Sequence, residues 1–312
     1  MSRLTITCVA LVCAISCKSE PAKTRAKKAA DAKEFWPDAP KPTIKTGTRT
    51  FRYNPANLGP YHMFADGGST DSPIAITFKM ILDLDFRAAD APTERNVHMT
   101  MLDMWMKAGP AKMVMRVNSN EFYFEQGEEK TSIKLGDKDS PFDVAELTTR
   151  PLSIFTFDAD GTVRVRANPD HPFETVGGGG AEDMLESALV LFPNLPPAPI
   201  APGHRWTVMH NTQLGTSQTR VDVEYAYEYV GDGACPSGTG TCSLLSFTAS
   251  SPGVDATTET GIKVNAAYGF AGKVFFSHDR GIIDESRVRA DIDIKSDQLS
   301  MQLGVTYSVK PG

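Results

Sequence analysis

Cysteine is the residue type in this 312-residue chain whose surroundings point to the most specific chemistry. Cys17 follows a positively charged start at Arg3, an apolar stretch from Leu4 to Ile15, and the small residue Ser16. This layout is typical of a signal peptide, and the apolar stretch is too short to cross a bilayer as a helix, which takes roughly 20 residues. We therefore expect an export signal at the N-terminus.

The run Ala14-Ile15-Ser16-Cys17 resembles the lipobox of bacterial lipoproteins, in which a small residue precedes a cysteine that is diacylated on sulfur. The resemblance implies that residues 1–16 are removed and that Cys17 anchors the mature protein to a membrane through its acyl groups. Because Lys18 is not the Asp that retains enteric lipoproteins in the inner membrane, the outer membrane is favoured, with the periplasmic and surface leaflets both open. The alternative is an ordinary secretory signal with an accidental cysteine.

Cys235 and Cys242 close a short Gly/Ser/Pro loop, CPSGTGTC, between two strand-like runs. Two cysteines at this spacing in an exported protein indicate a disulfide. A zinc site is disfavoured because no second cysteine or histidine pair lies nearby with ligand spacing. The spacing is also not that of a redox-active C-x-x-C motif.

Other catalytic chemistry has little support in the sequence. The chain contains no G-x-S-x-G, H-E-x-x-H, phosphate-loop or dinucleotide motif. The six histidines are scattered, and the acid pairs Asp83/Asp85 and Asp291/Asp293 fall on the polar faces of strand-like runs. We therefore predict no catalytic residue, no metal site and no cofactor, and keep a hydrolase as the least favoured reading.

Residues 17–45 are rich in Lys, Ala and Pro, with only Phe35 and Trp36 able to bury much surface. Such a composition predicts a flexible tether. Residues 18–45 carry eight basic and four acidic side chains, whereas the chain as a whole has net charge −6. A basic tether suits an anionic membrane surface, although its charges also serve to keep a linker soluble. The acidic remainder disfavours nucleic acid as a partner.

Residues 46–312 are expected to form a single β-rich domain, because apolar residues alternate with polar ones over long runs. The run 76–87 is apolar at every even position. Apolar residues likewise alternate at the odd positions of 220–229 and 299–309 and at the even positions of 287–294. Asp and Gly between strand-like runs predict hairpins at 157–163 and 277–283. The apolar phase slips by one residue between Met101 and Leu102, which predicts a β-bulge.

One segment, residues 181–192, has the period of a helix, with acidic residues in its first turn. The domain thus divides into possible halves, 46–176 and 205–312, joined by this helix and a Pro-rich loop. One helix cannot cover so large a sheet, so the sheet must curl, stack or leave an apolar concavity. The predicted fold class is mostly β, with long antiparallel curved sheets or a half-barrel around one central helix.

This architecture is similar to the LolA/LolB-like half-barrel carriers of lipoproteins and lipids, and the run FPNLPPAPIAPGHRW looks like a joint found in uncharacterised bacterial lipoproteins. The resemblance implies an apolar cavity and no catalytic residues. Seven of the twelve methionines fall in residues 80–115, and methionine adapts to varied apolar partners. The alternative is that they fill gaps in a core. The candidate lining residues are Met80, Leu82, Met99, Met104, Met113, Leu185 and Leu189.

The sequence therefore favours a lipid-anchored, non-catalytic module that binds an apolar ligand, such as a lipid or acyl chain, in a curved sheet. The alternative is a structural or interaction lipoprotein with a closed, dry core, whose partner is another protein of the cell envelope.

Overall fold

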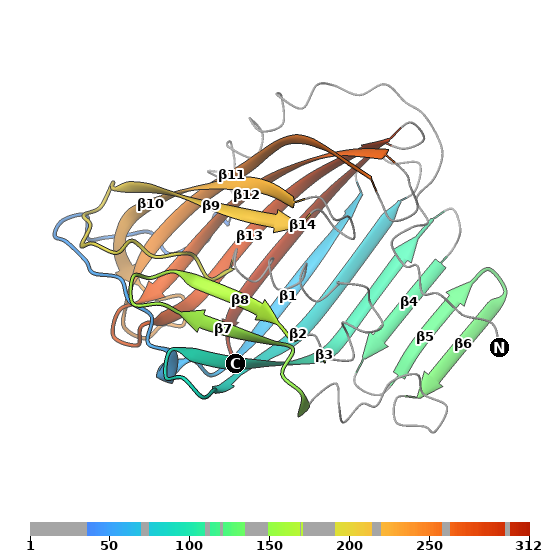
Figure 1. Cartoon of the computed structure of the whole chain (residues 1–312), viewed down its shortest axis with the longest axis horizontal. Coiled ribbons are helices and arrows are strands. Elements are labelled where there is room, and N and C mark those ends of the chain that lie inside the picture. The colour runs from blue at the N-terminus through green and yellow to red at the C-terminus, as the bar shows by residue number, and fades with distance from the viewer. Residues whose placement is uncertain are drawn as a thin grey trace.

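The computed structural model describes residues 36–69, 75–109, 113–118, 121–134, 149–168, 170, 191–213, 220–257, 263–296 and 300–312. Within these residues the chain is almost entirely β (Figure 1), as the alternating pattern predicts. The one helical element with both ends described is the 3-10 turn Pro55–Asn57, which Asn54 caps by accepting a hydrogen bond from the amide of Ala56.

Fourteen strands make up the described sheet. In the N-terminal half they are β1 (Pro60–Ser69), β2 (Ile76–Ala88), β3 (Glu94–Ala108), β4 (Met113–Asn118), β5 (Glu121–Gln126), β6 (Glu129–Lys134), β7 (Ser153–Phe157) and β8 (Val163–Ala167). In the C-terminal half they are β9 (Arg205–Gln213), β10 (Arg220–Ala234), β11 (Thr241–Thr257), β12 (Lys263–Ser277), β13 (Ile282–Ser296) and β14 (Ser300–Pro311).

The sheet is antiparallel throughout and runs in the order β6-β5-β4-β3-β2-β1-β14-β13-β12-β11-β10-β9. The β7–β8 hairpin branches from it, because β7 pairs with the first residues of β3. Strands β1 and β14 pair over nine residue positions, from Tyr61 opposite Pro311 to Ser69 opposite Leu303. The two predicted halves of the domain are therefore parts of one sheet.

Local sequence signals predict several details of this sheet correctly. The partner of β2 shifts from Asp103 at Ile81 to Met101 at Leu82, so Leu102 is the extra residue of a bulge, as the slip in apolar phase predicts. Hairpins join β7 to β8 and β12 to β13 at the two predicted turns. The disulfide Cys235–Cys242 is also confirmed.

The sheet is curled (Figure 1), and residues 36–59 and 191–204, which lie outside the strands, run along one end of it. Asn194 bridges β8 and β9, because its side-chain oxygen accepts from the amide of Val163 and its carbonyl accepts from Trp206 Nε1. Tyr53 also reaches this Pro-rich segment, since its hydroxyl donates to the carbonyl of Pro193 at 2.8 Å. We call this the closed end; the opposite end of the long strands is the open end.

The closed end is packed with aromatic rings. Phe51 lies 5.3 Å from Tyr229 and 5.6 Å from Phe276, centroid to centroid, while Tyr53 contacts Phe157. Phe192 contacts Tyr61, Phe86 and Phe155. Edge-on contacts of this kind stabilise a core beyond the area that they bury. The closed end is therefore a packed core built from both halves of the chain.

The central helix expected over residues 181–192 is not supported by the described residues, which include only Leu191 and Phe192 of that segment. Both side chains are fully buried. No helix in the described ranges is long and apolar enough to cross a membrane.

Residues 36–45, which the composition assigns to a flexible tether, contact the sheet. Trp36 is 7 % exposed, packs on Phe275, and carries the guanidinium of Arg287 over its ring at 4.1 Å. The amide of Ile44 donates to the carbonyl of Asp232 at 2.9 Å. These contacts were not predicted, because the segment was assigned from its basic, Pro-rich composition. Residues 1–35, with the predicted signal peptide and Cys17, lie outside the described residues.

Candidate functional site

A continuous apolar face crosses the sheet from β9 to β3. The register places nine residues in one row across nine strands, each directly opposite the next: Val208, Tyr225, Ala249, Phe270, Ala290, Val305, Gly67, Phe78 and Met106. The neighbouring row toward the closed end is Trp206, Tyr227, Phe247, Gly272, Val288, Tyr307, Ala65, Met80 and Met104. Directly opposed side chains on adjacent strands share a face, so the two rows form one surface.

Exposure changes along this face. Toward the closed end Leu82, Leu84 and Phe86 of β2 are 2–5 % exposed, whereas Ile76, Phe78 and Met80 at the open end are only half-buried. The same gradient holds on β1, β3, β12 and β13. On β14 buried and half-buried positions alternate instead, because Met301 and Val305 are 8 % and 2 % exposed while Leu303 and Tyr307 are half-buried. We call the following half-buried residues the open-half residues: Phe78, Met80, Met104, Met106, Phe124, Val264, Tyr268, Phe270, Ile292, Ile294, Leu303 and Tyr307.

The described candidate lining residues fall on this face, but not all of them at its accessible part. Met80 and Met104 pair across β2 and β3 in the open half. Leu82 and Met99 are 2 % and 6 % exposed and belong to the packed core. Met113 pairs with Ala108 at the start of β4, and Leu185 and Leu189 lie outside the described residues.

The sequence reasoning missed the contribution of the C-terminal strands. Tyr268, Ile292 and Leu303 continue the open half across β12, β13 and β14. The period-two pattern of residues 287–309 contains Ile292 and Leu303, but the candidates came from the methionine-rich region 80–115 and the expected helix 181–192. The alternation of all strands would have found these positions.

The open-half residues are uncharged, and the charged side chains of the same strands alternate with them on the other face. Arg289 donates to Asp291 there, and Arg87 to Asp85, in exposed pairs. This confirms that these acidic residues belong to a solvated face. Within the described part of β9, the ionisable residue on the apolar face is His210, which packs edge-on against Tyr225. Burial lowers the pKa of His210, so its neutral form is favoured.

A second cluster lies at the rim of the closed end, around the buried carboxylate of Asp232. Its oxygens accept hydrogen bonds from Arg49 Nε at 2.6 Å, from the Tyr229 hydroxyl at 2.6 Å and from Ser243 Oγ at 2.5 Å. Burial alone would raise the pKa of Asp232, but these donors outweigh it and hold the pKa below its ordinary value. The cluster fastens the segment around Arg49 to β10 and β11.

This cluster holds Ser, His and Asp but does not form a catalytic triad. His278 Nε2 lies 2.6 Å from Ser243 Oγ, and the hydroxyl of Ser243 donates to Asp232 rather than to histidine. A triad needs the histidine between the serine and the acid. Ser243 is moreover fully buried. Its arrangement suits a structural role.

Two neighbouring tyrosines of β10 provide a matched test of this role. Burial, followed by the bond to Asp232, raises the pKa of Tyr229 to about 12, whereas the Tyr227 hydroxyl is buried without a hydrogen-bond partner in the described structure. We expect Tyr229→Phe to lower the free energy of unfolding by about 1–3 kcal/mol and Tyr227→Phe to be neutral or stabilising. Urea denaturation of both variants measures this, and equal losses would contradict the assignment.

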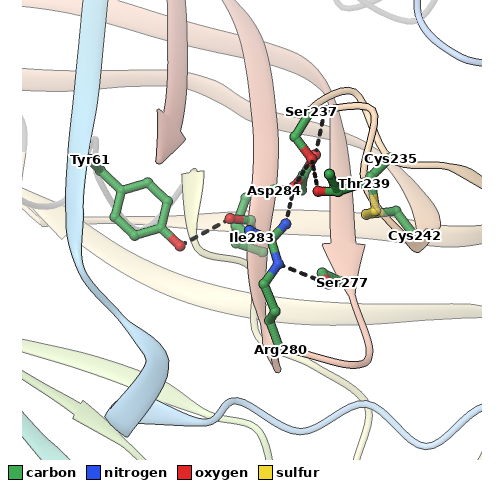
Figure 2. Close-up of polar contacts among 9 residues, drawn as sticks. All are labelled: Tyr61, Cys235, Ser237, Thr239, Cys242, Ser277, Arg280, Ile283 and Asp284. Atoms are coloured by element: carbon green, nitrogen blue, oxygen red, sulfur yellow. Dashed lines mark hydrogen bonds and ion pairs between the residues drawn. A yellow bond between two sulfur atoms is a disulfide. The ribbon is translucent and has the colours of Figure 1, made fainter. Parts of the chain in front are cut away.

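The disulfide loop is held by a third buried group, Asp284 of β13 (Figure 2). Asp284 accepts from the amide of Ser237 at 2.9 Å, from Ser237 Oγ at 2.8 Å, and from Arg280. Cys235, Cys242 and Asp284 lie close enough to resemble a metal site, but both sulfurs are bonded to each other. Asp284 and the disulfide therefore hold the loop in place and do not bind a metal.

We expect the double variant Cys235→Ala/Cys242→Ala to unfold with a free energy lower by about 2–3 kcal/mol, from the entropy of closing so short a loop. Guanidinium denaturation under oxidising conditions measures the loss. The wild type measured with a reductant serves as the control, and it should lose a similar amount. A double variant as stable as the oxidised wild type would show that Asp284 holds the loop without the disulfide.

Comparison with known proteins assigns no family. No protein-family model matches the chain, and no curated protein matches it. Among solved structures, a lipovitellin structure that concerns lipid–protein interactions is similar over 81 % of this chain and 25 % of its own, with 10 % identity and a TM-score of 0.41. The chain thus spans about a quarter of that lipovitellin chain.

A protein of unknown function from the DUF3598 family of Nostoc punctiforme PCC 73102 matches over 83 % of this chain and 99 % of its own, with 8 % identity and a TM-score of 0.15. Both TM-scores are too low to assign a fold or a function, so the argument for function comes from the sheet itself.

Proposed function

We propose that this chain is a lipid-anchored, non-catalytic binding protein of the bacterial cell envelope, which holds a lipid or acyl chain against the open half of its curved sheet. The observation that carries the proposal is the gradient along one apolar face. Its closed end is filled with aromatic rings, whereas its open-half residues remain half-buried across β2, β3, β5 and β12–β14. A contiguous apolar face that is not fully buried is typical of interaction sites and ligand-binding grooves.

The test of ligand binding uses two charge insertions in the same strand, β14. Leu303→Asp places a carboxylate on the open half, and Ser308→Asp places one on the polar face, opposite Arg287. Lipids are extracted from each purified full-length protein and measured by mass spectrometry, with circular dichroism to verify folding. We expect Leu303→Asp to lose most of the lipid that the wild type retains, and Ser308→Asp to retain it.

Wild-type protein that carries no lipid from several expression hosts would overturn the binding proposal. It would favour the alternative of an interaction protein of the envelope with a closed core.

The anchoring part of the proposal rests on the run before Cys17 and is tested separately. Cells expressing the full chain are grown with a clickable fatty acid, and the protein is recovered from membrane fractions. We expect label on the wild type, in the outer-membrane fraction, and none on Cys17→Ser. Equal labelling of both proteins would remove the lipid anchor without affecting the ligand-binding test.

A further inference from the structure

The chemical class of the ligand follows from where the cationic groups of the chain are engaged; this inference rests on the proposed function. Sites that recognise an acidic headgroup place a cation or several donors against it, because a buried anion without such partners is strongly disfavoured. The question is therefore whether a described arginine is available to the apolar face.

Four described arginines near the closed end are engaged. Arg49 is paired with Asp232, and Arg280 with Asp284. Arg95, 8 % exposed, donates to the carbonyls of Pro55, Pro92 and Glu94. Arg52 donates to the carbonyls of Phe51, Pro196 and Pro197. Each of these four guanidinium groups already has an oxygen partner within the chain.

Among the described residues, the two register rows of the face offer neutral polar groups only. His210 favours its neutral form, as described above, and the remaining polar groups in the two register rows are the hydroxyls of tyrosines and the indole of Trp206. Tyr227 is 1 % exposed, and this burial raises its pKa well above the ordinary value because the charged form would lose its hydration. A carboxylate placed against the two rows would lose its hydration and find no cation among their described side chains.

We infer that the open half binds uncharged lipid, such as long-chain esters and alcohols, and discriminates against the ionised form of a free fatty acid. An ester oxygen loses far less hydration than a carboxylate on entering such a face.

The experiment compares methyl oleate, oleyl alcohol and sodium oleate, which share one chain. Each displaces a neutral fluorescent hydrocarbon probe from the delipidated full-length protein at about pH 8, where a dispersed carboxylic acid is ionised. We expect both neutral probes to bind at least about tenfold more tightly than oleate. Equal or tighter binding of oleate overturns this inference but leaves the proposed function standing, whereas no binding of any of the three overturns both.

A gain-of-charge pair adds an independent readout. Leu303→Arg supplies a cation to the open half, while Ser308→Arg supplies one to the polar face of the same strand. We expect Leu303→Arg to increase oleate affinity at least about tenfold and Ser308→Arg to leave it unchanged. Met80→Lys, on β2, provides a second insertion if Leu303→Arg does not fold. A folded insertion variant without increased oleate affinity counts against the inference.

Discussion

Replacing Asp232 with alanine is expected to lower the free energy of unfolding by about 3–5 kcal/mol, among the largest losses of any single polar substitution in the described structure. Asp232 is fully buried and accepts from Arg49, Tyr229 and Ser243 at once. Removing its carboxylate leaves two buried hydroxyls without their acceptor and releases the segment around Arg49. Asp222→Ala is the matched control on the same strand, because Asp222 is exposed.

Urea denaturation at neutral pH measures both variants. Asp222→Ala should unfold close to wild type. If Asp232→Ala also stays within about 1 kcal/mol of wild type, the cluster does not fasten the closed end.

Acid should remove the same contribution in the wild type. The folded-state pKa of Asp232 lies below its ordinary value, so the folded state binds fewer protons than the unfolded chain as pH falls. The stabilisation is therefore present above the unfolded pKa, about 3.9, and is lost below it. Burial, with a smaller opposing effect of Asp232, lowers the pKa of His278, so its protonation below about pH 6.5 acts in the same direction. The difference between wild type and Asp232→Asn should shrink from pH 7 to pH 3.

Replacing Phe51 with alanine is the second change with a large expected effect, about 3–5 kcal/mol. Phe51 is fully buried among Tyr229, Phe276 and His278. The loss tests whether the N-terminal segment belongs to the folded core. Phe64→Ala is the control, because Phe64 is 37 % exposed on the polar face of β1. Thermal denaturation followed by circular dichroism should show a clearly lower midpoint for Phe51→Ala, and similar midpoints would place the segment outside the cooperative unit.

Local features of this fold could be predicted from the sequence, because their causes are local. The bulge at Leu102 appears as a slip in alternation, the hairpins as Asp-Gly turns, and the disulfide as a short cysteine loop. Each depends on residues within a few positions of one another. Alternation likewise identified the apolar faces of β2, β10, β13 and β14.

Pairing across the chain could not be predicted in this way. Nothing in the alternation of residues 60–69 selects residues 300–311 as a partner, since many strands present equally apolar faces. The packing at the closed end depends on the single side chain of Asn194, which joins the Pro-rich segment to β8 and β9, and no sequence pattern marks such a contact. Trp36 was assigned to the tether because composition was averaged over 29 residues, whereas one indole against Phe275 and Arg287 is enough to dock the segment.

The pairing of β1 with β14 also determines when the chain can fold. The ladder joins Tyr61 to Pro311, and β1 is flanked by β2 on its other side. The centre of the sheet thus forms only when the last residues of the chain are available, and the loop that closes it spans most of the sequence. Such long-range contacts slow folding. We expect the newly made chain to stay unfolded until residues 300–311 have been synthesised, and removal of β14 to prevent folding of the whole sheet rather than of one half.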